Sequence, residues 1–308
     1  MIGTNIHSTR EARRPGPGKD PGPAADLPET VIEPDAGWTG LGLGEVWKHR
    51  ELLLVLTWRD IKARYKQTLL GAGWAVFQPA LVMVVFTVFL ARMGGVPAGD
   101  LPYPLFVYAG LLPWTFFSNA VLSAGNSVVS SENLITKVYF PRLVIPFASA
   151  GAGLIDFGIA LGGLVLLMAF YGIAPGWPIL LAPLVVLLLT LAAVGIGTLV
   201  AALGVKYRDF RQVFPFLVQV GMFATPVIYM QPQQAALERS TLPAVAGAVP
   251  LVLALNPVNG LIGFFRACFL GGPLPWADLA VSAGIVAGLF VVACLYFRRV
   301  ESSFADII

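Results

Sequence analysis

One carboxylate lies inside an otherwise uncharged apolar part of the sequence. Asp156 is the only acidic residue within the long apolar runs, and none of these runs contains Lys or Arg. A charge at such a position is costly and is often functional. Two roles are open: a structural hydrogen bond inside a helical bundle, or a step in a transport relay. The structural role is favoured, because a carboxylate without a basic partner makes a poor relay.

Motifs that carry catalysis are absent from the sequence. There is no G-x-x-x-x-G-K-[ST] phosphate loop and no G-x-S-x-G nucleophile turn. His7 and His49 are the only histidines, and they form no metal-ligand spacing with the two cysteines. We therefore expect no catalytic site, metal or cofactor on this chain.

Two short segments between apolar runs combine charge with large apolar side chains. The first consists of Glu132, Asn133, Leu134, Ile135, Thr136, Lys137, Val138, Tyr139, Phe140, Pro141 and Arg142. The second consists of Lys206, Tyr207, Arg208, Asp209, Phe210 and Arg211. Four apolar residues of the first are expected on the surface together: Leu134, Ile135, Tyr139 and Phe140. Exposed apolar groups ringed by charge indicate a docking surface.

The composition places these residues in a membrane protein. The chain has 308 residues, of which 57% are hydrophobic and 12% are charged. An average soluble protein contains about 25% charged residues, so a soluble chain of this length could not cover its surface. An ordinary cytosolic enzyme, a disordered protein and a coiled coil are therefore excluded. The net charge of +3 gives no indication of nucleic-acid binding.

Six apolar runs reach the length of about 17 residues that a helix needs to cross about 30 Å of hydrocarbon. They are predicted at 68–91, 104–126, 143–171, 179–203, 213–230 and 279–297. The predicted fold is an all-α polytopic membrane protein with six transmembrane helices, in a domain that spans residues 68–308.

The basic residues near these runs are distributed unevenly. With a cytoplasmic N-terminus, thirteen lie on the inner side: Lys48, Arg50, Arg59, Lys62, Arg64, Lys66, Lys137, Arg142, Lys206, Arg208, Arg211, Arg298 and Arg299. Three lie on the outer side: Arg92, Arg239 and Arg266. This distribution obeys the positive-inside rule and predicts that both termini are cytoplasmic.

Two segments precede the first run. Residues 1–44 are rich in Pro and Gly and predict a flexible cytoplasmic tail. Residues 45–67 predict an amphipathic helix in the membrane interface, with basic residues such as Arg59 beside its apolar face. That face consists of Trp47, Leu54, Trp58, Ile61 and Tyr65. The alternative, a helix packed on a soluble domain, lacks a domain to receive it.

The stretch 231–275 contains two short apolar pieces that Asn256-Pro257 separates. If this stretch were one span, Arg298 and Arg299 would lie outside, against the charge rule. We therefore predict a re-entrant or interfacial helical hairpin on the outer face, which is tolerated where protein buries it or water lines it.

Small residues recur at every fourth position in two of the runs. Gly158 and Gly162 form one set, and Ala193, Gly197 and Ala201 form the other. Such sets allow helices to approach closely, either within a subunit or between subunits. Packing within one subunit is the favoured interpretation for both.

Several stretches resemble ABC-2-type permeases that export polysaccharides. They are 56–71 with Trp74 and Gln78-Pro79, then 132–142, 206–209 and 255–257. The resemblance covers about residues 31–308. It implies a homodimer in the bacterial inner membrane that binds two copies of a separate ATPase, which would hold ATP and magnesium. It also implies that 132–142 is the ATPase-coupling loop and that helices within 231–272 gate the outer end of the path.

The family's export path borders spans one and five. A sugar chain presents hydroxyls and weakly apolar ring faces, so we expect aromatic platforms and neutral polar groups along its path. The residues of these types at the expected positions are Trp74, Phe77, Gln78, Phe216 and Phe223. For each of them, a lipid-facing or core position is the alternative.

The leading hypothesis is the permease subunit of an exporter of lipid-linked polysaccharide such as O-antigen. An ABC-2 permease for another amphiphile, such as a teichoic acid, a capsule glycan, a lipid or a drug, is the alternative within transport. An intramembrane glycosyltransferase or acyltransferase would need clustered catalytic residues, which the sequence lacks. A membrane scaffold without transport is the third class.

Overall fold

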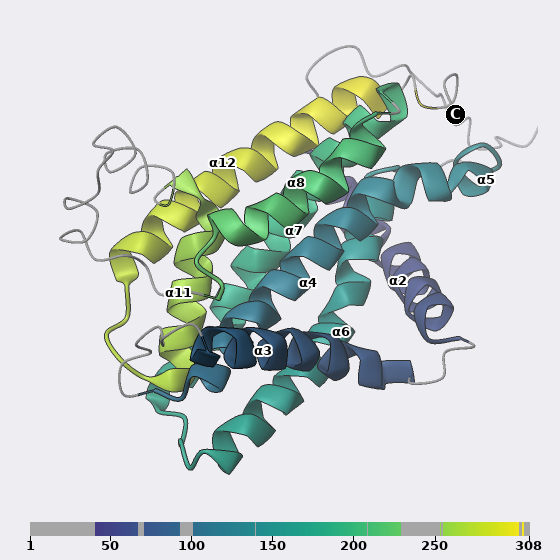
Figure 1. Ribbon diagram of the computed structural model, residues 1–308. Coiled ribbons are helices and arrows are strands. Elements are labelled where there is room, and N and C mark those ends of the chain that lie inside the picture. The colour runs from purple at the N-terminus through teal and green to yellow at the C-terminus, as the bar shows by residue number, and fades with distance from the viewer. Residues whose placement is uncertain are drawn as a thin grey trace, which may run out of the picture. The chain divides into compact units, whose positions relative to one another are not determined.

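The computed structural model describes residues 41–66, 71–92, 101–138, 140–207, 209–228, 253, 255–301 and 304. Within these residues all secondary structure is helical (Figure 1). The helices are α1 Leu43–Lys48, α2 Arg50–Tyr65, η1 Gly71–Gly73, α3 Trp74–Arg92, α4 Tyr103–Ser130, α5 Glu132–Ile135, α6 Val144–Phe170, η2 Trp177–Leu181, α7 Ala182–Lys206, α8 Phe210–Ala224, α11 Pro257–Leu270 and α12 Trp276–Glu301. Most of the predicted tail, 1–44, lies outside the described residues.

Five helical stretches of the described chain are long and apolar enough to cross a membrane. They are Gly71–Phe89, Tyr103–Ser130, Val144–Phe170, Trp177–Lys206 and Trp276–Glu301. Each coincides with one of the six predicted spans. The prediction of an all-α, polytopic membrane protein is therefore confirmed at this level.

The predicted fifth span, 213–230, differs from the structure. The helix there, α8, has 15 residues and ends at Ala224. At 1.5 Å per residue it is about 22 Å long, less than the roughly 30 Å of a hydrocarbon core. The helix ends because Thr225 precedes Pro226, and a residue before proline is driven from helical into extended backbone.

The described part of the predicted outer hairpin is α11, while 231–252 lie outside the described residues. Asn256 caps this helix by accepting a hydrogen bond from the Val258 amide at 3.1 Å, and Pro257 occupies its first turn. The helix ends at Gly271, whose positive φ of 82° suits glycine. Most of its side chains are buried, and it packs against α4, α7 and α12.

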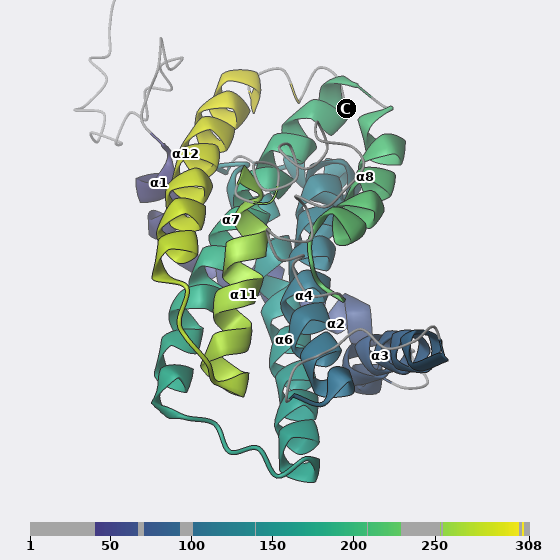
Figure 2. The ribbon, with the colours of Figure 1, turned by 60° about the vertical axis from the view of Figure 1, so that its left-hand side comes forward.

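The central helix of this part of the chain is α4. It packs against α6 on one side and α7 on the other, α12 packs on α7, and α2 packs on α6 (Figures 1 and 2). Of the residues in the most apolar 18-residue stretch of each helix, 78% are buried in α4. In α3, which lies across α4 and α6, only 6% is buried. The face of α3 away from the bundle is therefore open to lipid or to another subunit.

The two sets of small residues have different surroundings. A Cβ atom built on Gly197 would lie 2.5 Å from the Cβ of Ala124, so this set brings α7 directly against α4. A Cβ built on Gly158 or Gly162 would meet no atom within 4 Å. Packing within one subunit is therefore confirmed for the set on α7. For Gly158 and Gly162 it is wrong among the described residues, because both lie on an exposed face of α6.

The close contact of α7 with α4 predicts an unequal response to the same substitution. Gly197→Ala should lower the melting temperature, because overpacking costs about 1–3 kcal/mol. Gly158→Ala should leave it unchanged or slightly raised, because alanine favours a helix by about 0.5–1 kcal/mol over glycine. Thermal unfolding of the purified chain in detergent, followed by size-exclusion chromatography, measures both. Equal melting temperatures would contradict this packing.

Candidate functional site

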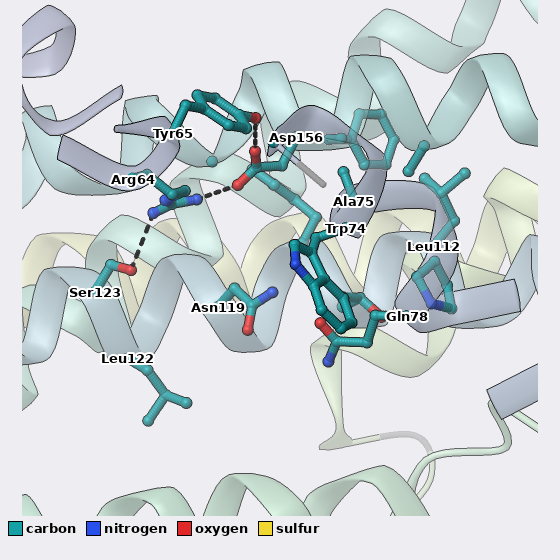
Figure 3. Close-up of a pocket in the computed structure, with 17 residues that line it drawn as sticks. Arg64, Tyr65, Trp74, Ala75, Gln78, Leu112, Asn119, Leu122, Ser123 and Asp156 are labelled. Atoms are coloured by element: carbon teal, nitrogen blue, oxygen red, sulfur yellow. Dashed lines mark hydrogen bonds and ion pairs between the residues drawn. The ribbon is translucent and has the colours of Figure 1, made fainter. Parts of the chain in front are cut away.

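A cavity of about 420 Å³ lies between α3, α4 and α6, with the last residues of α2 at one end (Figure 3). Its walls combine charged, neutral polar and aromatic side chains. The most informative of the lining residues are Arg64, Tyr65, Trp74, Gln78, Asn119, Ser123 and Asp156. The cavity has a charged end near α2 and an aromatic and amide end near the start of α3 (Figure 3).

The charged end is built around Asp156 of α6. Its carboxylate accepts hydrogen bonds from the Arg64 guanidinium and from the Tyr65 hydroxyl. Arg64 also donates to the Ser123 hydroxyl of α4 at 3.4 Å. The side chains of Arg64 and Asp156 remain 31% and 24% exposed, so the ion pair faces the cavity. Two consecutive residues therefore fasten the end of α2 to the middle of α6.

The expectation that Asp156 lacks a basic partner is wrong. Arg64 lies 92 residues earlier in the chain and reaches Asp156 because α2 runs beside α6. Ser149 donates to Asp60 at 2.9 Å, about 10 Å further back along α6. From its position in the sequence, Arg64 belongs to an inner segment outside the spans. Its pairing with Asp156 becomes visible only because α2 packs along α6 in the structure.

The Tyr65 hydroxyl is held in its neutral form. Burial raises the pKa of Tyr65, and its hydrogen bond to Asp156 raises it further, to about 12. A phenol that donates to a carboxylate resists ionisation, so Tyr65 remains a donor at physiological pH. It binds Asp156 without adding a second charge to the cavity.

The predicted apolar face of the amphipathic helix is only partly correct. Trp47, Leu54 and Trp58 are exposed, as a helix in contact with lipid requires. Ile61 is buried and Tyr65 is directed at Asp156, so these two belong to the face that packs on α6. The receiving surface is the membrane domain itself.

Cations lie beside the exposed tryptophans of α1 and α2, the two helices that form the predicted amphipathic segment. The Lys62 ammonium lies 5.4 Å from the Trp58 ring centroid, and the Arg50 guanidinium 5.9 Å from that of Trp47. Arg59 pairs with Asp60 at 3.0 Å on the exposed side. Such pairs of aromatic and basic side chains suit headgroup depth.

Two of the five predicted path residues line the cavity, and a third packs against one of them. Trp74 and Gln78 line it, and the Phe77 ring lies edge-on to Trp74 with centroids 5.4 Å apart. Phe216 and Phe223 lie on α8, more than half exposed, and do not line this cavity. The structure therefore brings the residues of α3 together and leaves those of α8 apart.

Sequence reasoning missed the α4 wall of the cavity. Asn119 and Ser123 are four residues apart on α4 and both line the cavity. Polar residues one helical turn apart within an apolar run share a face, and such residues in transmembrane segments often mark a functional surface. That spacing was the available signal.

The predicted docking loop, 132–142, is less exposed than expected. Ile135 and Phe140 are buried, which corrects the expectation that they lie on the surface. They anchor the loop to the core, while Val138 is 54% exposed. Tyr139 lies outside the described residues. The loop borders a shallow cavity of about 240 Å³, lined by Ile135, Thr136, Lys137, Val138, Phe140 and Arg142.

The second inner segment presents an aromatic surface. Tyr207 is 49% exposed, and its ring lies 5.4 Å from the Lys206 ammonium and 6.3 Å from the Phe210 ring. Asp209 precedes the first turn of α8, and Arg208 lies outside the described residues. The tyrosine and phenylalanine are therefore accessible beside a positive charge, as a docking segment requires.

A network of charged residues joins the first loop to the end of α12. Glu301 accepts the Arg142 amide at 2.8 Å, and the Arg142 guanidinium donates to the Glu301 carbonyl. One turn earlier, Arg298 pairs with Glu45 of α1 at 2.8 Å. Sequence reasoning placed Arg142 in the predicted docking loop, gave Arg298 a topological role only, and missed both glutamates. Hydrogen bonds therefore link the loop to the end of α12, and an ion pair links α12 to α1.

Comparison with known proteins identifies a family. The family model for ABC-2 type transporters matches residues 51–258. The chain is 32% identical over 260 residues to the O-antigen export system permease protein RfbA of Myxococcus xanthus, which covers 83% of this chain and 95% of that protein. Two proteins of the same name from Klebsiella pneumoniae are 25% and 23% identical, each over 84% of this chain and 95% of their own length.

The family match and the five membrane-length helices agree. The match covers more than half of the chain and includes the charged cavity wall at Arg64 and Asp156. The chain therefore belongs to the ABC-2 type transporter family, of which it is a non-catalytic, multi-pass transmembrane permease.

Proposed function

We propose that the chain is the transmembrane subunit of an ATP-driven exporter that moves a lipid-linked polysaccharide of the O-antigen class across the bacterial inner membrane. One observation carries the proposal. Permeases named for O-antigen export match 83–84% of this chain and 95% of their own length. A match of that extent covers the inner loops and the proposed path helices, so it is more than a shared pattern of apolar runs.

The cavity supports this substrate class. Its volume of about 420 Å³ lies within the range of about 300–1,000 Å³ typical of ligand sites. The Trp74 ring is half exposed and offers a face for a sugar ring, while the Gln78 and Asn119 amides can bind hydroxyls. These neutral groups suit a glycan better than a purely apolar lipid tail.

ATP and magnesium would bind to a separate ATPase, two copies of which would bind a homodimer of this chain. Both termini would lie in the cytoplasm, in keeping with the basic residues of the inner segments. In this arrangement α8 belongs to the fifth of six spans. The helix α11 belongs to an outer re-entrant segment before the sixth, where its burial against α4, α7 and α12 would protect its backbone.

The ATPase is proposed to dock on the loop at 132–142 and on the segment 206–209. Exposed Lys137 and Val138 would meet the partner, while buried Ile135 and Phe140 would pass its movement into the core. The Glu301 contacts provide a second route, because a displacement of Arg142 also displaces the end of α12.

A photoreactive residue in the cavity tests the substrate. Benzoylphenylalanine in place of Trp74 should cross-link to the polysaccharide of the native host, because position 74 faces the cavity. The same residue in place of Val88, on the exposed face of α3, is the control and should not cross-link to it. Immunoblotting of the chain for attached glycan measures both. Glycan at position 88 but not at position 74 would refute the cavity as the path.

Substitution of Glu301 tests the coupling. Glu301→Ala should reduce export about fivefold or more while ATP hydrolysis by the complex persists, because the loop loses its contact with the Glu301 carboxylate and keeps only the one with the Glu301 backbone carbonyl. Glu301→Gln retains a carbonyl acceptor for the Arg142 amide and should export better than Glu301→Ala. Surface polysaccharide and ATPase rate are measured together, with Glu51→Ala as an exposed acidic control. Normal export by Glu301→Ala, with normal membrane levels, would contradict the coupling.

A further inference from the structure

The backbone after α8 is buried without being helical. Thr225 has extended dihedral angles of −107° and 133°, and Thr225, Val227 and Ile228 are all nearly inaccessible. Peptide groups removed from water must find hydrogen-bond partners, most of all at membrane depth. The carbonyls of this segment therefore need partners from elsewhere in the fold. We name residues 225–228 the α8 break.

Side chains from two other helices bind three consecutive carbonyls of the α8 break. Arg266 of α11 donates to the Pro226 carbonyl at 2.9 Å and also to the Val227 carbonyl. Tyr103, at the start of α4, donates to the Ile228 carbonyl at 2.8 Å. One guanidinium thus spans two neighbouring carbonyls through a rigid, planar fork of donors, which an ammonium does not offer.

A second contact ties the beginning of α11 to the same segment. The Asn256 amide donates to the Thr225 hydroxyl at 2.8 Å, while its carbonyl oxygen caps α11. The Thr225 hydroxyl in turn donates to the Gly221 carbonyl, the last turn of α8, at 2.9 Å. The end of α8 is therefore joined to α11 at two points, through Asn256 and through Arg266.

The surroundings of Arg266 are shaped for its guanidinium. The guanidinium carbon lies 3.9 Å from the Phe106 ring centroid, a cation–π contact. Gly110 of α4 lies beneath it, and a Cβ there would collide with both the guanidinium and the Val227 carbonyl. Among the described residues no carboxylate pairs with Arg266, so carbonyl dipoles and an aromatic face balance its charge.

We propose that Arg266 is a positioning residue for transport that fastens the end of α8 to α11. It can bind the Pro226 and Val227 carbonyls only while they remain outside a helix, so it stabilises the break itself. The assignment of α8 to the export path and of α11 to the outer segment is part of the proposed function. The transport role of Arg266 therefore rests on that function. The fastening does not, because it follows from contacts within this chain.

Accessibility of the α8 break tests the fastening directly. The full chain with Val227→Cys, and with both native cysteines replaced by alanine, is placed in lipid nanodiscs and labelled with a fluorescent maleimide. With Arg266 present, labelling should be slow. Arg266→Gln should speed it about tenfold or more, the loss expected for hydrogen bonds to a charged group. Arg266→Lys, which keeps the charge but loses the fork, should fall between.

Two glycine variants separate the fastening from general instability. Gly110→Ala displaces the guanidinium without changing any charge and should also speed labelling. Gly263→Ala lies on α11 with no atom within 4 Å of its new Cβ and should not. If Arg266→Gln fails to fold, Arg266→Lys decides the matter, because it keeps the charge and leaves Gly110 in place beside the Val227 carbonyl. Slow labelling in every folded variant, or fast labelling in Gly263→Ala as well, would overturn the proposal.

The transport role has its own readout. In host cells, Arg266→Gln should lower the polysaccharide exported per ATP hydrolysed, and Arg266→Lys should restore part of it. Faster labelling with unchanged export would refute the positioning role in transport and leave the fastening intact. A host that exports no polysaccharide through the parent chain would instead refute the proposed function, while the labelling result would still hold.

Discussion

A charge that protein or lipid withdraws from water must be bound by other polar groups, because an apolar environment offers no solvation. Three charged side chains of this chain meet that constraint through partners distant in sequence. Asp156 binds Arg64 across 92 positions, Arg266 binds the Pro226 carbonyl across 40, and Glu301 binds the Arg142 amide across 159. Apolar packing brings helices together without direction, whereas these contacts fix which parts must meet.

The same contacts connect structure with the proposed transport. The Arg64–Asp156 pair holds α2 against α6 and at the same time forms the charged end of the cavity. Glu301 joins the proposed ATPase-docking loop to α12, and Arg266 joins the end of α8 to α11. A movement of the inner loop would thus act on helices that polar contacts already join in pairs.

The sequence was sufficient for features that are local along the chain. Hydropathy located five helices of membrane length, and the Asn256-Pro257 pair marked the start of α11, because each depends on neighbouring residues only. The early end of α8 had a local signal as well, in Pro226. The partner of Asp156 and the burial of Phe140 had none, since both depend on how distant helices run beside each other.

The most direct measurement is a double-mutant cycle on Arg64 and Asp156, read as the stability of the purified chain in detergent. Arg64→Gln and Asp156→Asn should each destabilise the protein, because each leaves the other charge without its partner. The double variant should be more stable than the sum of the two losses implies, with a coupling of about 1 kcal/mol or more. Strictly additive losses would contradict the claim that this ion pair fastens α2 to α6.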